Sequence, residues 1–161
     1  MATHDGDRVV ALSRQLTQAH HELRRRLGEI RTNIGHRRLA DDTLLTHCLA
    51  FCAALTSHHR GEDDGMFSQL LRERPDLAGT VAKLVEDHGL ISSILSRVGE
   101  LANRAAGSDG PALQAIGREL DGLAAIMESH FSYEERTIGA ALDGGTPDPD
   151  WPERVFGFGG A

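Results

Sequence analysis

The chain has 161 residues, of which 40% are hydrophobic and 25% charged, a composition ordinary for one globular domain with its own core. Its net charge of −7 argues against nucleic acid as the main partner, because phosphate binding requires a basic surface. No apolar run approaches the roughly 20 residues of a membrane span, and the start MATHDGDR lacks the layout of a signal peptide, so we expect a cytoplasmic protein without a membrane partner.

Hydrophobic residues recur with helical spacing along most of the chain, and no stretch alternates with a period of two. The predicted helices cover about residues 7–34, 41–74, 76–106 and 111–144. Asp41 is a good N-cap residue, and Pro111 suits a first helical turn. Short connections between long helices predict an all-α fold, an antiparallel up-down-up-down four-helix bundle formed by residues 1–143.

Residues 144–161 differ in composition from the rest, with three prolines, several glycines and the aromatic residues Trp151, Phe156 and Phe158. This composition predicts an irregular, non-helical C-terminal tail. Aromatic side chains are costly to leave in water, so we expect them to pack on the bundle or on a second subunit, which would make a homodimer.

The two cysteines, Cys48 and Cys52, are four residues apart on one helix face, where a disulfide is geometrically poor. We interpret them as small buried thiols. A zinc site shared with histidines and a redox pair are the alternatives.

The most informative pattern is His-x-x-x-Glu, which occurs as His58–Glu62 and again as His130–Glu134. At about 100° per residue, both glutamates lie within the apolar stripe of their helix. A carboxylate in a helix core is costly unless it is paired or bound to a metal. The repeated motif therefore predicts a buried polar site, and we favour a metal centre over a polar network without metal.

Two further histidines have comparable positions on the other two helices. His20 lies about 50° from the centre of its apolar stripe and His21 about 150°, so His20 should point inward and His21 outward. His88 lies among apolar residues of the third helix. His59 falls at the flank of its stripe and stays outside the predicted site.

The predicted metal ligands are six inward-facing residues, His20, His58, Glu62, His88, His130 and Glu134. Their spacing repeats, because 68 residues separate His20 from His88 and 72 separate both His58 from His130 and Glu62 from Glu134. A helix pair used twice suits two metal ions bridged by two carboxylates. Imidazole and carboxylate together suit iron, manganese or zinc better than calcium or magnesium.

These residues resemble the hemerythrin-like, or HHE cation-binding, family. The resemblance covers roughly residues 8–142 and is carried by AHHEL (His20), HHRGEDD (His58, Glu62), EDHGLI (His88) and HFSYEER (His130, Glu134). It implies a four-helix bundle with a non-haem di-iron centre, in which the four histidines bind terminally and the two glutamates bridge. It also implies two oxo- or hydroxo-bridged iron ions in preference to manganese or zinc.

The chain differs from the oxygen-carrying hemerythrins, which have a second third-helix histidine in place of Ser92 and an aspartate in place of Glu134. Fewer histidines leave more open coordination positions, which favour reaction over storage of a bound ligand. We therefore expect a site that binds or reacts with dioxygen, peroxide or nitric oxide. The alternatives are a di-iron enzyme, either a small-molecule oxidase or a catalase or peroxidase, and a protein that stores or donates iron. No residue receives a catalytic role.

Overall fold

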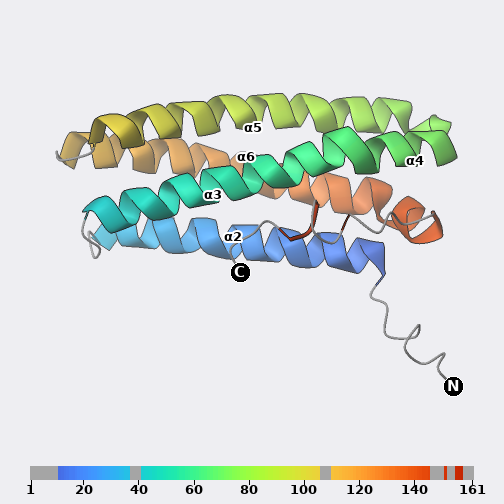
Figure 1. The fold of residues 1–161 in the computed structure, drawn as a ribbon, viewed down its shortest axis with the longest axis horizontal. Coiled ribbons are helices and arrows are strands. Elements are labelled where there is room, and N and C mark those ends of the chain that lie inside the picture. Colours follow the sequence, from blue (N-terminus) through green and yellow to red (C-terminus); the bar gives the residue numbers. More distant parts are fainter. Residues whose placement is uncertain (1–10, 37–40, 106–109, 146–150, 152–154, 158–161) are drawn as a thin grey trace, which may run out of the picture.

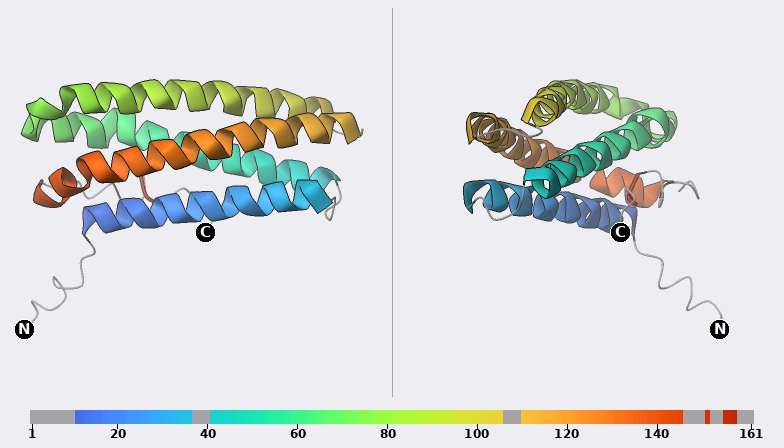
Figure 2. Two further views of the ribbon diagram at one scale, coloured as in Figure 1. Left: turned by 180° about the vertical axis from the view of Figure 1, so that it is seen from behind. Right: turned by 60° about the vertical axis from the view of Figure 1, so that its left-hand side comes forward.

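The computed structural model of the chain describes residues 11–36, 41–105, 110–145, 151 and 155–157. Every element in these ranges is helical, which confirms the predicted all-α class for this part of the chain. Four long helices lie side by side along the long axis of the molecule (Figure 1), and the views in Figure 2 show the same helical bundle from two other sides. No helix among these residues combines the length and apolar character needed to cross a bilayer.

Three of the four long helices match the predicted ones to within a few residues over the described ranges, and the second ends earlier than predicted. The four are α2 (Leu12–His36), α3 (Asp41–Gly61), α5 (Ala78–Ala105) and α6 (Gly110–Gly144). Between α3 and α5 the chain forms a π-helix, η1 (Glu62–Met66), a short helix, α4 (Phe67–Glu73), and a single 3-10 turn, η2 (Pro75–Leu77). The predicted second helix, 41–74, is therefore not one regular α-helix.

The end of α4 follows from the sequence. Arg74 leaves the helical region with φ −134° and ψ 75°, because the ring of Pro75 disfavours α-helical geometry in the residue before it. The π-helix has no comparable marker, since its i→i+5 hydrogen bonds need one extra residue per turn rather than a breaker residue.

Helix α6 makes its most extensive contacts with α2 and α5. The apolar core divides into two clusters, one toward each end of the bundle. On α2, Leu16 belongs to one cluster and Leu23 to the other, with His20 between them. On α6, Met127 and Ile138 are divided in the same way. The clusters thus leave a layer between them, and this layer holds the polar residues described below.

The described part of the C-terminal segment packs on the bundle. Trp151 and Val155 are buried, and both belong to the apolar cluster that contains Leu16 and Ile138. The Val155 N–H donates to the Trp151 carbonyl at 2.9 Å, so the backbone turns there. Phe156 is partly buried against the same cluster, whereas Phe158 lies outside the described residues.

The cysteines agree with their interpretation as small buried thiols. Cys48 is buried and Cys52 partly buried, and both are free. Burial raises the pKa of the Cys48 thiol to about 12 and that of Cys52 to about 11, so neither is activated as a thiolate.

Candidate metal centre

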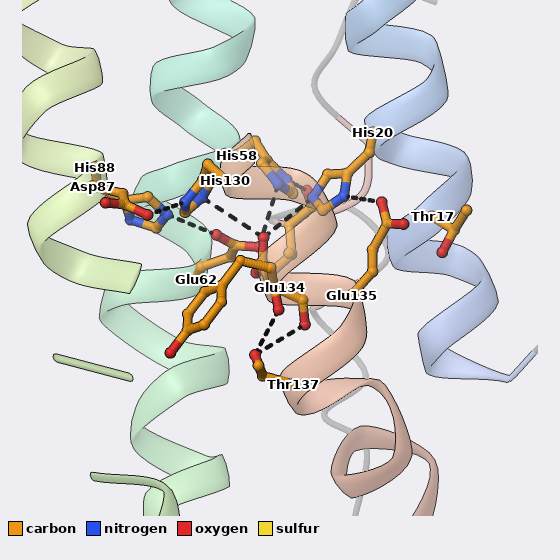
Figure 3. Close-up of polar contacts among 12 residues, drawn as sticks. Thr17, His20, His58, Glu62, Asp87, His88, His130, Glu134, Glu135 and Thr137 are labelled. Carbon is orange, nitrogen blue, oxygen red and sulfur yellow. Dashed lines mark hydrogen bonds and ion pairs between the residues drawn. The ribbon is translucent and has the colours of Figure 1, made fainter. Parts of the chain in front are cut away.

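The structure brings all six predicted residues together in the layer between the two apolar clusters, and none of them is more than 5% exposed. Figure 3 shows their side chains pointing toward one another from the surrounding helices. The six are His20 from α2, His58 from α3, Glu62 from η1, His88 from α5, and His130 and Glu134 from α6.

Each glutamate lies between imidazoles from different helices. Glu62 Oε2 is 3.2 Å from His58 Nε2, and its Oε1 is 3.1 Å from His88 Nε2. Glu134 Oε1 is 3.3 Å from His20 Nε2 and 3.7 Å from His130 Nε2. Each carboxylate therefore lies within 3.7 Å of imidazole nitrogens from two helices, where it could help to hold a cation.

These short contacts lack hydrogen-bond geometry. Among the described residues, no hydrogen bond reaches Nε2 of His20, His88 or His130, or either carboxylate oxygen of Glu62 or Glu134, although all these atoms are buried. A buried polar atom without a hydrogen bond costs about 1–3 kcal/mol. So many unsatisfied polar atoms in one layer require a common explanation, and cations between the nitrogens and oxygens would provide it.

The opposite nitrogen of each ring, Nδ1, is held in place. The four acceptors are Glu135 for His20 at 2.7 Å, Asp63 for His88 at 2.8 Å, Asp87 for His130 at 3.0 Å and the Val155 carbonyl for His58 at 2.5 Å. An Nδ1–H that donates to such an acceptor leaves the lone pair on Nε2, which points into the layer. Metal-binding histidines are usually oriented in this way.

Most of the imidazoles are held neutral, the form that binds a metal. Burial lowers the pKa of His20 to about 4, although the Glu135 hydrogen bond opposes this shift. Burial also lowers the pKa of His59 and His130. His88 is the exception: burial works against its charged form, but the hydrogen bond to Asp63 and the charge of Glu62 raise its pKa to about 9.

Burial of the two glutamates side by side shifts their pKa values in opposite directions. Burial and the charge on Glu62 raise the pKa of Glu134 well above its usual value. Burial would also raise the pKa of Glu62, but the adjacent imidazoles of His58 and His88 hold it well below the usual value. Without a cation, Glu134 is thus the member of the pair that favours the proton, and cation binding would release it.

The sequence prediction omitted His59, which the structure places in the same layer at 6% exposure. Its ring stacks on His88, with centroids 3.7 Å apart and planes 13° from parallel. Its buried Nε2 makes no hydrogen bond to any described residue. An ideal rotation of about 100° per residue put His59 at the flank of the apolar stripe. The spacing His59-x-x-Glu62 could have found it, because residues i and i+3 share a helix face.

Two groups of residues among those described could each hold a cation, with one ligand atom per residue and all ligand atoms of a group within 4.8 Å of one another. The first group is His20, His58, Glu62 and Glu134, and the second is His59, Glu62, His88 and His130. Glu62 belongs to both groups, so the two positions are adjacent and share a carboxylate.

Glu62 is also the first residue of the π-helix η1. Glu62 Oε1 lies 3.1 Å from His88 Nε2, and Oδ1 of the neighbouring Asp63 lies 2.8 Å from His88 Nδ1. Single π-turns inside α-helices are frequent at functional sites. The irregular turn therefore coincides with the residue that joins the two groups.

Two further described histidines and Ser92 lie outside the two groups. His21 is exposed, as the helical-face argument predicts, and so is His47. The side chains of His4 and His36 lie outside the described residues. Ser92 faces a separate surface pocket beside Cys52 and Arg60.

Comparison with known proteins gives one match. Residues 11–142 match the family model described as the hemerythrin HHE cation-binding domain. Searches of curated proteins and of solved structures found no significant match. The matched range includes both groups of buried histidines and glutamates, which fit the cation binding named in the family description. The chain therefore belongs to the hemerythrin HHE cation-binding domain family.

Proposed function

We propose that the chain is a non-haem di-iron protein, an up-down-up-down bundle that binds or reacts with dioxygen, peroxide or nitric oxide. The first iron position uses His20, His58, Glu62 and Glu134, and the second uses His59, His88 and His130 together with Glu62. This assignment keeps the six ligands expected from sequence and adds His59 as a fifth imidazole.

The observation that supports the proposal best is the shared carboxylate. Glu62 turns one oxygen toward His58 and the other toward His88, so a single residue serves both groups. A polar network without metal is the competing explanation, and it leaves Nε2 of His20, His88 and His130 and the glutamate oxygens without a hydrogen bond to any described residue. Imidazole and carboxylate donors suit iron better than calcium or magnesium.

The burial of the site limits what can react there. The ligands are at most 6% exposed, so a bulky substrate has no access to them in this conformation. A surface groove of about 450 Å³ between α5 and α6 has His130 and Asp87 among its lining residues. Dioxygen, peroxide and nitric oxide are small enough for such a route. Iron supplies reversible one-electron chemistry toward these molecules, while the surrounding residues orient the ligands and exclude bulk water.

The decisive experiment combines metal content with optical spectra. The protein is purified without added metal, reduced anaerobically, and then exposed separately to dioxygen and to hydrogen peroxide. We expect two irons per chain and a near-ultraviolet charge-transfer band that disappears on reduction and returns on oxidation. Zinc or no metal after this treatment would contradict the proposal.

The same experiment separates the binding function from an enzyme. A spectral change with dioxygen that persists for minutes indicates binding or sensing. Steady consumption of peroxide over many turnovers indicates a catalase or peroxidase. The groove beside His130 makes the second outcome chemically reasonable, because it gives a small substrate a path to a ligand of the second group.

A further inference from the structure

The groups that orient the histidines follow the internal repeat, with one exception. The acidic residue after each core glutamate, Asp63 after Glu62 and Glu135 after Glu134, accepts from a histidine of the other helix pair. These two contacts are 2.8 Å to His88 and 2.7 Å to His20. Two of the four orienting contacts are therefore equivalent in the two halves of the repeat.

The other two contacts are not equivalent. In the second half, Asp87 immediately precedes His88 and accepts from His130 at 3.0 Å. The corresponding residue in the first half, immediately before His20, is Ala19, whose side chain cannot accept a hydrogen bond. The imidazole that corresponds to His130 is His58, and its Nδ1 instead contacts the backbone carbonyl of Val155 at 2.5 Å.

Buried side chains of the C-terminal segment fix the position of the Val155 carbonyl. Val155 is completely buried and Trp151 is 4% exposed, and both are anchored in the apolar cluster next to the site. The indole Nε1 of Trp151 lies 3.7 Å from where a Cβ on Gly65 of η1 would be. Ala19 and Phe156 line the same small surface pocket. The segment thus lies beside the small residue at position 19.

We propose that the Val155 carbonyl is the fourth orienting group of the metal centre and replaces the carboxylate that the first half lacks at residue 19. The family match ends at residue 142, so the centre is completed by a segment beyond the matched domain. Val155 is a positioning residue, because it acts through His58 and does not reach a cation itself. This inference rests on the proposed metal site.

A neutral carbonyl makes the two halves unequal. A carboxylate acceptor, as on His130, increases the electron donation of an imidazole more than an amide carbonyl does. His58 is consequently the weaker donor of the two, and the first group depends on the correct placement of a segment that is distant in sequence.

The test removes the anchors of the segment in the full-length chain. Trp151→Ala/Val155→Ala should release the carbonyl from His58, and Val81→Ala is the control because Val81 is a buried valine of the same cluster on α5. In metal-free, ¹⁵N-labelled protein, the wild type should show His58 as the Nδ1–H tautomer with a protected proton. The double variant should lose this signal, and Val81→Ala should keep it.

The iron-loaded proteins give the second readout. Loss of an orienting group costs about tenfold to a hundredfold in metal affinity. We expect an Fe(II) chelator to extract one of the two irons at least about tenfold faster from the double variant than from Val81→Ala.

A rescue separates orientation from packing. Ala19→Asp, added to the double variant, supplies a carboxylate at the position equivalent to Asp87 and should restore slow iron extraction. Ala19→Leu adds apolar volume without an acceptor and should not. An unchanged His58 signal in the double variant, or equal rescue by leucine and aspartate, would overturn the inference. The tautomer measurement needs no metal, so it stands even where the wild type fails to bind iron, an outcome that contradicts only the proposed function.

Discussion

The two halves of the bundle carry the same sequence pattern but differ in protonation. His20 and His88 occupy equivalent positions, and each Nδ1 contacts a carboxylate at 2.7 or 2.8 Å. Yet burial lowers the pKa of His20 to about 4, whereas the Asp63 hydrogen bond and the charge of Glu62 outweigh burial at His88 and raise its pKa to about 9. Both rings have a carboxylate beside each nitrogen, but Glu134 beside His20 favours the proton, whereas Glu62 beside His88 stays ionised. The neighbouring ring of His58 also lowers the pKa of His20. The repeat thus determines which residues point inward, and neighbours from other helices determine their charge.

The largest expected effect on iron content comes from substituting Glu62, the residue that both groups share. Glu62→Gln keeps the shape of the side chain but removes a charged oxygen from each group, so we expect the loss of both irons. Glu134→Gln affects the first group directly and should leave one iron per chain in the second. Metal content by elemental analysis, with protein concentration from amino-acid analysis, checks both expectations.

The control is Glu22→Gln, because Glu22 is on the surface of α2 and pairs there with Arg25 and Arg26. It should bind iron as the wild type does. Equal iron loss in Glu62→Gln and Glu134→Gln would show that the two groups are not joined through Glu62 in the way we propose.

The helical faces that form the site, and its repetition in the two halves, could be predicted from the sequence. Helical periodicity identified the inward faces, and the separations of 68 and 72 residues indicated that the site is built twice. The six predicted residues converge in one buried layer, because a carboxylate on an apolar stripe has few other stable arrangements.

The remaining features depend on contacts between elements. Asp63, Asp87 and Glu135 are adjacent in sequence to predicted ligands, but their role depends on which histidine faces them from another helix. The π-turn at Glu62 changes the local rotation that an ideal helix assumes. The Val155 carbonyl has no sequence signature at all, since every residue has one.

A smaller effect on iron affinity should distinguish His59 from His21. Each follows an inward-facing histidine, but His59 is buried at the site and His21 is exposed. His59→Ala removes a ligand of the second group only, so we expect the affinity for one of two irons to fall by at least about a hundredfold. His21→Ala is the matched control, because His21 also follows an inward histidine but is exposed. Competition with a chelator of known affinity measures both. Normal binding by His59→Ala would return the second group to three protein ligands.

The smallest effect concerns pH and sharpens the contrast between His20 and His88. A pKa of about 9 means that His88 holds a proton at neutral pH in the metal-free protein, and this proton stabilises the fold until the pH rises through that value. A cation must displace it, so the affinity of the second group should rise about tenfold per pH unit below pH 9. His20, with a pKa of about 4, adds no such dependence near neutral pH.

Two isosteric variants make this a direct comparison. Asp63→Asn removes the charge that faces His88 and lowers its pKa, so the pH dependence of the second group should flatten. Glu135→Gln makes the same change beside His20 and should leave the slope near neutral pH as in the wild type. Anaerobic titrations with Co(II) between about pH 6 and about pH 8 give affinity and proton release together. Equal slopes for the two variants would mean that the halves are electrostatically alike, and the protonation contrast drawn from the structure would then be wrong.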